Sequence, residues 1–163
     1  MSKSITATKV TKVTGKSILD QIKVVPNDIT FLHPITKKYN SLGGASGWLG
    51  AALTGINTCP DGVGQYQPYA NGSIYWSPQT AAHEVHGLIR ARWSSMGWEK
   101  SFLGYPLTDG STCPDGVGKY NHFQGGSIYW SPATGAWEVH GAIKDKYATL
   151  GWEKSFLKYP LTN

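Results

Sequence analysis

The chain has 163 residues, of which 40% are hydrophobic, 15% charged and 12% aromatic, and its formal net charge is +5. This low charge and high aromatic content exclude a disordered chain, and no apolar run approaches the roughly 20 residues that a membrane-spanning helix needs. Twenty glycines and seven tryptophans also argue against a coiled coil or a helical bundle, so a compact β-rich or mixed architecture remains.

The N-terminal segment carries the positive charge. Residues 1–44 hold seven lysines against Asp20 and Asp28, a net charge of +5, and the rest of the chain is neutral overall. We interpret these lysines as residues that keep a strand at residues 5–13 soluble and protect its edge. The alternative is nucleic-acid binding, which usually places basic residues on the main recognition surface, so we expect no nucleic-acid partner.

The opening residues contain no apolar segment of a secretory signal. We therefore expect a cytoplasmic protein, or one that is exported without such a signal. An extracellular, cell-wall location is expected if a signal has been removed.

From residue 34 onward the sequence repeats with a period of 54 residues. Four segments recur at this offset: 58–64 as 112–118, 72–78 as 126–132, 84–87 as 138–141, and 97–103 as 151–157. Residues 35, 39, 42 and 43 join the same register, which gives a third, partial copy. Fixed-period self-similarity of this length is the signature of a repeat architecture.

Each unit is predicted to contain a helix, a loop and a β-hairpin. Ile89, Trp93 and Met96 share one helical face, and Gly97 is placed to end that helix with a positive φ. Residues 98–118 are rich in proline and glycine and predict a loop. Asn71-Gly72 predicts a tight turn between two strands, and a further short strand at residues 84–86 leads into the next helix.

We predict an α+β repeat protein in one domain, residues 1–163. Its parts are an N-terminal strand and closing segment (1–33), repeat 1 (34–87), repeat 2 (88–141) and a half repeat 3 (142–163). No unit has enough apolar surface to fold alone, so neighbouring units must complete the core. Gly15-Lys16-Ser17-Ile18 resembles residues 72–74, so we expect the N-terminal segment to supply the hairpin missing from repeat 3. Three helix-plus-hairpin units would then close in a pseudo-threefold, propeller-like ring.

The unit resembles the LGFP repeat, found in tandem in cell-wall-associated proteins. The naming tetrapeptide is present as Leu103-Gly104-Tyr105-Pro106, and residues 115–118, 122–123, 126–132 and 135–139 follow the rest of the pattern. Copy one departs from it with Leu49-Gly50-Ala51-Ala52. The resemblance covers residues 34–163 and implies a wall-anchoring or glycan-binding module rather than an enzyme.

Chemistry-bearing residues are few. His83 and His86 point to opposite faces of a strand and make a poor metal chelate, so His86 and His140 are expected to cap or hydrogen-bond the following helix. Asp61 and Asp115 lie in Pro-Asp-Gly turns, each with one carboxylate, too few for calcium. Cys59 and Cys113 are expected to be free and buried. We predict no catalytic residue, no metal and no cofactor.

The candidate binding residues are aromatic. Alternation along residues 73–77 places Ile74 and Trp76 in the core and leaves Tyr75, like Tyr129, half-exposed. Trp98 and Trp152 follow the helix-ending glycines beside polar neighbours. Flat rings beside polar groups suit a sugar, and the alternative is that the tryptophans wedge between units. The predicted glycan site comprises Trp98, Trp152, Tyr75, Tyr129, Glu99 and Glu153.

The leading hypothesis is a non-catalytic carbohydrate-binding module, lectin-like or specific for cell-wall polysaccharide, with its sites repeated around the ring. A protein–protein interaction scaffold, such as an inhibitor or toxin component, is the second hypothesis. The third is a wall-glycan hydrolase that uses Asp61 and Asp115 or Glu84 and Glu138. We expect a monomer or small homo-oligomer that does not insert into membranes.

Overall fold

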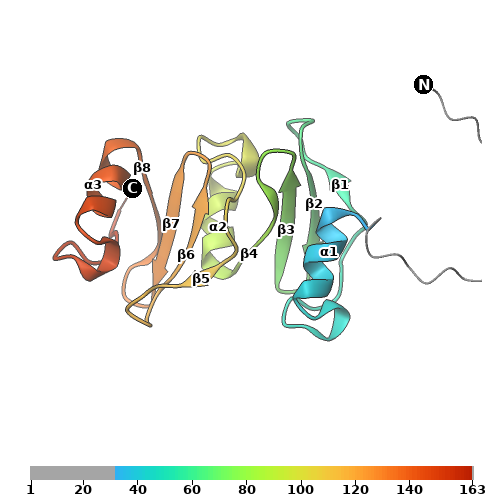
Figure 1. The fold of residues 1–163 in the computed structure, drawn as a ribbon, viewed down its shortest axis with the longest axis horizontal. Coiled ribbons are helices and arrows are strands. Elements are labelled where there is room, and N and C mark those ends of the chain that lie inside the picture. The colour runs from blue at the N-terminus through green and yellow to red at the C-terminus, as the bar shows by residue number, and fades with distance from the viewer. Residues whose placement is uncertain (1–31, 163) are drawn as a thin grey trace, which may run out of the picture. The chain divides into compact units, whose positions relative to one another are not determined.

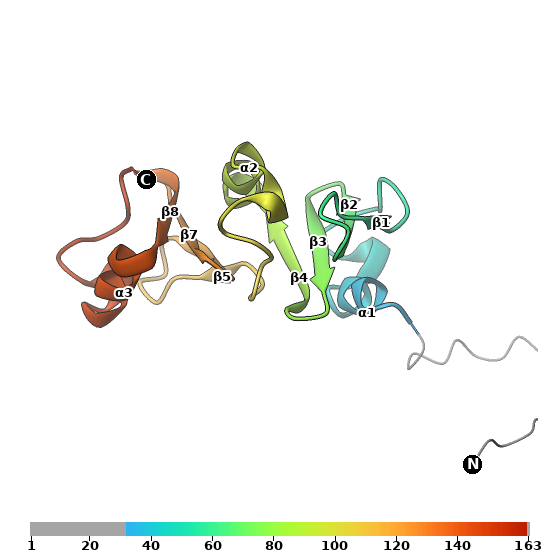
Figure 2. The same ribbon diagram turned by 90° about the horizontal axis from the view of Figure 1, so that it is seen from above.

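The computed structural model describes residues 32–162, and Leu32–Asn163 form one compact unit. In this part of the chain three helices alternate with two four-stranded antiparallel sheets, as Figures 1 and 2 show from two sides. The helices are α1 (Pro34–Ser41), α2 (Gly87–Ser95) and α3 (Gly141–Thr149), each followed by a short 3-10 turn, η3 (Gly44–Ser46), η4 (Trp98–Lys100) and η5 (Trp152–Lys154).

The two sheets repeat the same topology, each with its strands in sequence order. The first contains β1 (Asn57–Thr58), β2 (Gln65–Tyr69), β3 (Gly72–Ser77) and β4 (Ala81–His86). The second contains β5 (Ser111–Thr112), β6 (Lys119–Phe123), β7 (Gly126–Ser131) and β8 (Gly135–His140). The predicted hairpin is therefore correct, but it is the centre of a larger sheet. The Pro-Asp-Gly turn connects β1 to β2, inside the region predicted as loop.

Each helix ends where the sequence indicates. Gly97 has φ +102°, a left-handed conformation that glycine adopts without steric cost, and the equivalent Gly43 and Gly151 have φ +96° and +94°. The chain thus turns sharply into η3, η4 or η5 at the same place in every unit. This confirms the predicted helix ends.

Of the three helices, α2 packs between the two sheets. α1 contacts β3 and β4, whereas α2 contacts β7 and β8 on one side and β3 and β4 on the other. One apolar cluster therefore joins residues of both sheets around α2, including Tyr75 from the first sheet and Phe123 and Ile128 from the second. The first sheet is covered on both faces, by α1 and by α2.

This double covering corrects one sequence prediction. Tyr75 and Tyr129 were expected to be half-exposed, but they are only 4% and 3% exposed. Tyr75 packs edge-on against Trp93 of α2, at 4.6 Å between ring centroids, and Tyr129 packs in the same way against Tyr147 of α3, at 5.4 Å. Alternation predicts a sheet with one wet face, whereas helices here cover both faces.

The outer edge of β4 is sealed by the loop that enters the second sheet. The amide of Gly110 donates to the Glu84 side chain at 2.7 Å, the amide of Glu84 donates to Asp109 at 3.2 Å, and Asn121 donates to the carbonyl oxygen of Glu84 at 3.1 Å. Exposed sheet edges favour unwanted pairing, so this seal both joins the units and protects the edge.

The larger assembly differs from the predicted ring. The described residues form two separate four-stranded sheets with their helices, and no closed propeller is seen among them. The segment predicted to close the ring, residues 5–25, lies outside the described residues. No helix in residues 32–162 has the length and apolar character required to cross a bilayer.

Candidate functional site

The two predicted tryptophans are half-buried. Trp98 lies parallel to Tyr75, at 6.0 Å between centroids, and edge-on to Trp93 at 5.3 Å, while the Arg90 guanidinium lies over its ring at 5.2 Å. Trp152 repeats the two aromatic contacts with Tyr129 and Tyr147. Much of each ring is therefore occupied by packing within the protein.

Both tryptophans also have an unusual backbone conformation. Trp98 has φ +59° and Trp152 has φ +58°, where glycine is the usual residue, and the equivalent position in the first unit is indeed Gly44, with φ +57°. A non-glycine residue in this region costs about 1 kcal/mol or more. The backbone therefore explains why this position accepts glycine, and the packing of the tryptophan side chain offsets the strain.

Glu99 and Glu153 are not on the surface, because they are only 7% and 3% exposed. Each points into a cluster with a cysteine and an aspartate of the preceding β1–β2 or β5–β6 turn: Cys59 and Asp61, or Cys113 and Asp115. In each cluster one ligand atom from each of the three side chains lies within 4.8 Å of the other two. These glutamates, like Tyr75 and Tyr129, are therefore buried, whereas a sugar-binding surface requires exposed groups.

Both cysteines are free and buried, as predicted. Each lies beneath a tyrosine hydroxyl that donates to the neighbouring aspartate: Tyr105 to Asp61 at 2.7 Å, and Tyr159 to Asp115 at 2.6 Å. Sequence reasoning missed the clusters because Glu99 lies far along the chain from Cys59 and Asp61. The 54-residue register, which repeats all three residue types together, is the signal that was available.

An exposed aromatic side chain recurs at one position in every unit. It is Trp48, Phe102 or Phe156, and these are 45%, 54% and 79% exposed. The first two lie against the imidazole of a histidine at the end of β4 or β8: Trp48 against His86 at 4.7 Å, and Phe102 against His140 at 4.5 Å between centroids. The sequence analysis did not select these three residues.

His86 does not cap α2 with its side chain, contrary to the prediction. It occupies the N-cap position of α2, but its imidazole hydrogen-bonds Glu84 at 2.7 Å instead. Glu84 is only 2% exposed, so this hydrogen bond holds the imidazole from its buried side and fixes its orientation. The His140 side chain, at the N-cap of α3, likewise makes no capping hydrogen bond.

A pocket of about 300 Å³ lies beside His86. Its lining also includes Leu88 at the start of α2, and Lys119 and Trp130 of the second sheet. In the first unit the equivalent place is filled, because His33 contacts Trp76 edge-on at 5.7 Å and hydrogen-bonds Gln65 at 2.6 Å. The pocket exists beside α2 because the residue equivalent to His33 is Gly87.

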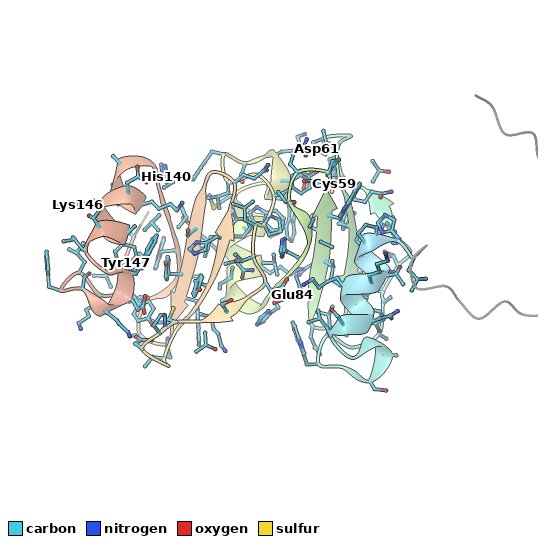
Figure 3. The ribbon with its side chains drawn as sticks, in the orientation of Figure 1. Cys59, Asp61, Glu84, His140, Lys146 and Tyr147 are labelled. Atoms are coloured by element: carbon cyan, nitrogen blue, oxygen red, sulfur yellow. The ribbon has the colours of Figure 1, made fainter. Side chains whose placement is uncertain are left out.

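A second pocket, of about 500 Å³, lies at α3 and the C-terminal residues. His140, Lys146 and Tyr147, all in its lining, lie together at that side in Figure 3. Its apolar lining includes Ile143, 71% exposed, whose equivalent in α2, Ile89, is 4% exposed under the second sheet. This pocket therefore corresponds to a helix face that a sheet covers one unit earlier.

Asp109 and Glu138 have structural partners. Burial raises the pKa of Asp109, but hydrogen bonds from His83, Lys38 and the Glu84 amide outweigh it and lower that pKa to about 2. Glu138, 4% exposed, accepts two hydrogen bonds from Arg92 at 2.6 and 2.9 Å. Arg92 of α2 and Lys38 of α1 occupy equivalent positions. Lys38 makes an ion pair with Asp109 in the loop before β5, and Arg92 makes one with Glu138 of β8.

These features define a tandem-repeat protein of the α+β class, in which α2 is shared by the two described sheets. The family to which the chain belongs is the LGFP repeat, which matches twice in tandem, at residues 49–101 and 103–155. Both matches begin at the leucine of the tetrapeptide. No curated protein matches the chain.

Proposed function

We propose that this protein is a non-catalytic glycan-binding module whose contacts centre on the exposed aromatic–histidine pairs. The observation that carries the proposal is the recurrence of Trp48, Phe102 and Phe156 at one position, each substantially exposed. An aromatic face packs against the C–H groups of a sugar, while an adjacent imidazole can hydrogen-bond its hydroxyls. His86 and His140 supply that imidazole in the first two pairs.

A missing neighbour does not account for the exposure of the first two pairs. Trp48 precedes the complete first sheet and Phe102 precedes the complete second sheet, yet the rings are 45% and 54% exposed. By contrast, Leu49 and Leu103, the next residues along the chain, are fully buried. The folded unit thus buries one apolar residue and presents the adjacent ring to solvent.

The pocket beside His86 extends the first pair. Lys119 offers a cation and Trp130 a second, half-buried aromatic surface next to the imidazole. Binding sites are typically apolar pockets with a few polar groups, and about 300 Å³ is at the small end of their usual range. A saccharide residue of anionic or hydroxyl-rich character suits this lining. Repeating such weak sites along a polymer would supply avidity.

The test compares exposed aromatic and exposed aliphatic positions. Replacing Trp48 and Phe102 with alanine should weaken binding to a soluble cell-wall polysaccharide by about 1–3 kcal/mol per site, by analogy with aromatic–base stacking. Val63 and Val117 are the matched controls, since they are 53% and 56% exposed and also recur in register. Calorimetric titration measures affinity, and chemical unfolding checks stability. Undiminished affinity in the Trp48→Ala, Phe102→Ala double variant would refute the proposed site.

The predicted closure of the units into a ring is the second part of this proposal. We propose that residues 5–25 supply a hairpin that covers α3, which would close the units in a pseudo-threefold, propeller-like arrangement. Support comes from the exposed apolar side chains of α3 and of the residues after η5, where Ile143, Leu157 and Leu161 are 71%, 48% and 71% exposed. Exposed apolar patches mark interaction surfaces, so a covering partner is expected here. A protein–protein interaction at α3 is the alternative.

Deleting residues 1–25 distinguishes coverage of α3 by this segment from a protein–protein interaction at α3. If the segment covers α3, the shortened chain should lose stability or associate through the uncovered face, as sedimentation velocity and urea unfolding would measure. Ile143→Glu should then reduce that association in the shortened chain. A shortened chain that remains a monomer of unchanged stability would rule out the proposed closure.

A further inference from the structure

We propose that the two Cys-Asp-Glu clusters are divalent transition-metal sites, each binding one cation of the zinc class. The first comprises Cys59, Asp61 and Glu99, and the second comprises Cys113, Asp115 and Glu153. Figure 3 shows Cys59 and Asp61 next to each other near one end of the first sheet. This inference is independent of the proposed glycan binding.

The geometry brings together suitable ligand atoms. One thiol sulfur and two carboxylate oxygens lie within 4.8 Å of one another in each cluster. Zinc holds sulfur at about 2.3 Å and carboxylate oxygen at about 2.0–2.2 Å, so its ligands lie somewhat closer together than this limit. Small side-chain rotations would complete three protein ligands and leave a position for water.

The buried glutamates give an independent reason to expect a cation. Glu99 and Glu153 are only 7% and 3% exposed, and the Oε1 atom of each is buried with no hydrogen-bond partner among residues 32–162. A buried unpartnered carboxylate oxygen is costly, and its occurrence at the same position in two units indicates a missing ligand. A cation bound by the cysteine and the aspartate would lie within its reach.

The local backbone holds the glutamate toward the cluster. Gly97 and Trp98 both have positive φ, so the chain reverses immediately before Glu99, and the same reversal precedes Glu153. The strained tryptophan therefore lies directly before the inward-pointing carboxylate in both copies. On the other side of the first cluster, Asp61 is held by the amide of Val63 at 2.9 Å.

The three residues of the cluster and the tyrosine that hydrogen-bonds its aspartate also occur together along the sequence. Fifty-four residues before Cys59, Asp61, Glu99 and Tyr105 the chain has Ile5, Ala7, Ala45 and Ala51. The positions one period earlier therefore lack the thiol, both carboxylates and the phenol at once. Joint presence at two sets of equivalent positions and joint absence at the third is expected of groups that share one ligand.

Soft thiolate ligands favour zinc and similar cations over calcium and magnesium, which prefer oxygen alone. A thiol binds such a cation as the thiolate, so binding should displace one thiol proton per site. The sulfur–metal bond replaces the S–H bond, and no oxidation occurs.

Cobalt(II) is the probe, because a cobalt–thiolate bond gives a charge-transfer absorption in the near ultraviolet. Chelator-treated full-length protein should bind two cobalt ions per chain with this absorption and release protons to a weak buffer. Zinc should displace the cobalt, raise the unfolding temperature and slow the reaction of both thiols with a thiol reagent. Absence of the thiolate band at millimolar cobalt would overturn the proposal.

Two sets of variants test the ligands. Cys59→Ser and Cys113→Ser should each remove half of the band, and together remove all of it. Glu99→Gln and Glu153→Gln keep the thiols, and should weaken cobalt binding by more than about 100-fold, the upper range for loss of a group that only supports a ligand. Asp109→Asn, a carboxylate outside the clusters, is the control and should leave the titration unchanged. Unaltered cobalt affinity in the folded glutamine variants would show that the glutamates are not ligands.

Discussion

Leu103 and Leu157 occupy the same position in consecutive units, yet Leu103 is fully buried and Leu157 is 48% exposed. The difference extends to the helices, since Ile89 of α2 is 4% exposed and Ile143 of α3 is 71% exposed. The second sheet follows α2 and covers it, whereas no sheet of the described residues follows α3. Whether an apolar side chain at a given repeat position is buried thus depends on the sheet of the next unit, not on its own unit alone.

The test with the largest expected effect replaces Leu103 and Leu157 with alanine. Leu103→Ala should lower the free energy of unfolding by about 2–5 kcal/mol, because it leaves a cavity between α2 and the second sheet. Leu157→Ala should cost less than about 1 kcal/mol if α3 is uncovered. Urea unfolding of both variants gives the difference. Equal losses would mean that residues 1–31 or a second copy cover α3.

A second test uses the cations of the two helices. Arg92→Met should lower the free energy of unfolding by about 3 kcal/mol, since it removes both hydrogen bonds to the buried Glu138 carboxylate. Lys146→Met changes the equivalent residue of α3 and should cost less than about 0.5 kcal/mol if α3 is uncovered. Thermal unfolding of the two variants side by side is sufficient. A large loss for Lys146→Met would point to a buried partner at α3.

A third test concerns a position at which the two copies should agree. Trp98 and Trp152 pack on sheets that are both present, so Trp98→Ala and Trp152→Ala should each cost about 1–3 kcal/mol of folding. Trp98→Gly should cost about 1 kcal/mol less than Trp98→Ala, because glycine accepts φ near +59° without strain. This reverses the usual order of alanine and glycine. The reverse result would show that the positive φ carries no penalty.

The smallest expected effect is a dependence on pH at the junction after the first sheet. The pKa of Asp109 is about 2 in the folded protein against an ordinary 3.8, so its contribution is present above pH 4 and is lost as the pH falls toward 2. Its side chain is 35% exposed, so we expect about 1 kcal/mol. Unfolding measured from pH 5 to 2 should show a shallower decline for Asp109→Asn than for the unaltered chain.

The helices, the central hairpins and the helix-ending glycines follow directly from the repeat register. What the sequence analysis misjudged was the second face of the sheet. Ile74, Tyr75 and Trp76 are three consecutive apolar residues, which is typical of a strand covered on both sides. Reading them as an alternating pattern placed Tyr75 at the surface, although it is 4% exposed.

The candidate sites were harder to predict for a different reason. Glu99 meets Cys59 only because α2 and its turn fold back across the first sheet, a contact between residues that are far apart in sequence. Trp48 and Phe102 were overlooked because they do not share one residue type, and the adjacent Leu49 and Leu103 appear equally apolar. Only the fold distinguishes the buried leucine from the exposed ring beside it.

The seal on the edge of β4 has a consequence for how such chains lengthen. The interface consists of α2, the edge of β4 before it, and the loop and second sheet after it, and the sequences of these elements recur with the 54-residue period. A gene segment of one period, duplicated from any starting point, therefore carries both halves of the interface. The inserted unit can seal its predecessor and be sealed by its successor without any new contact having to evolve.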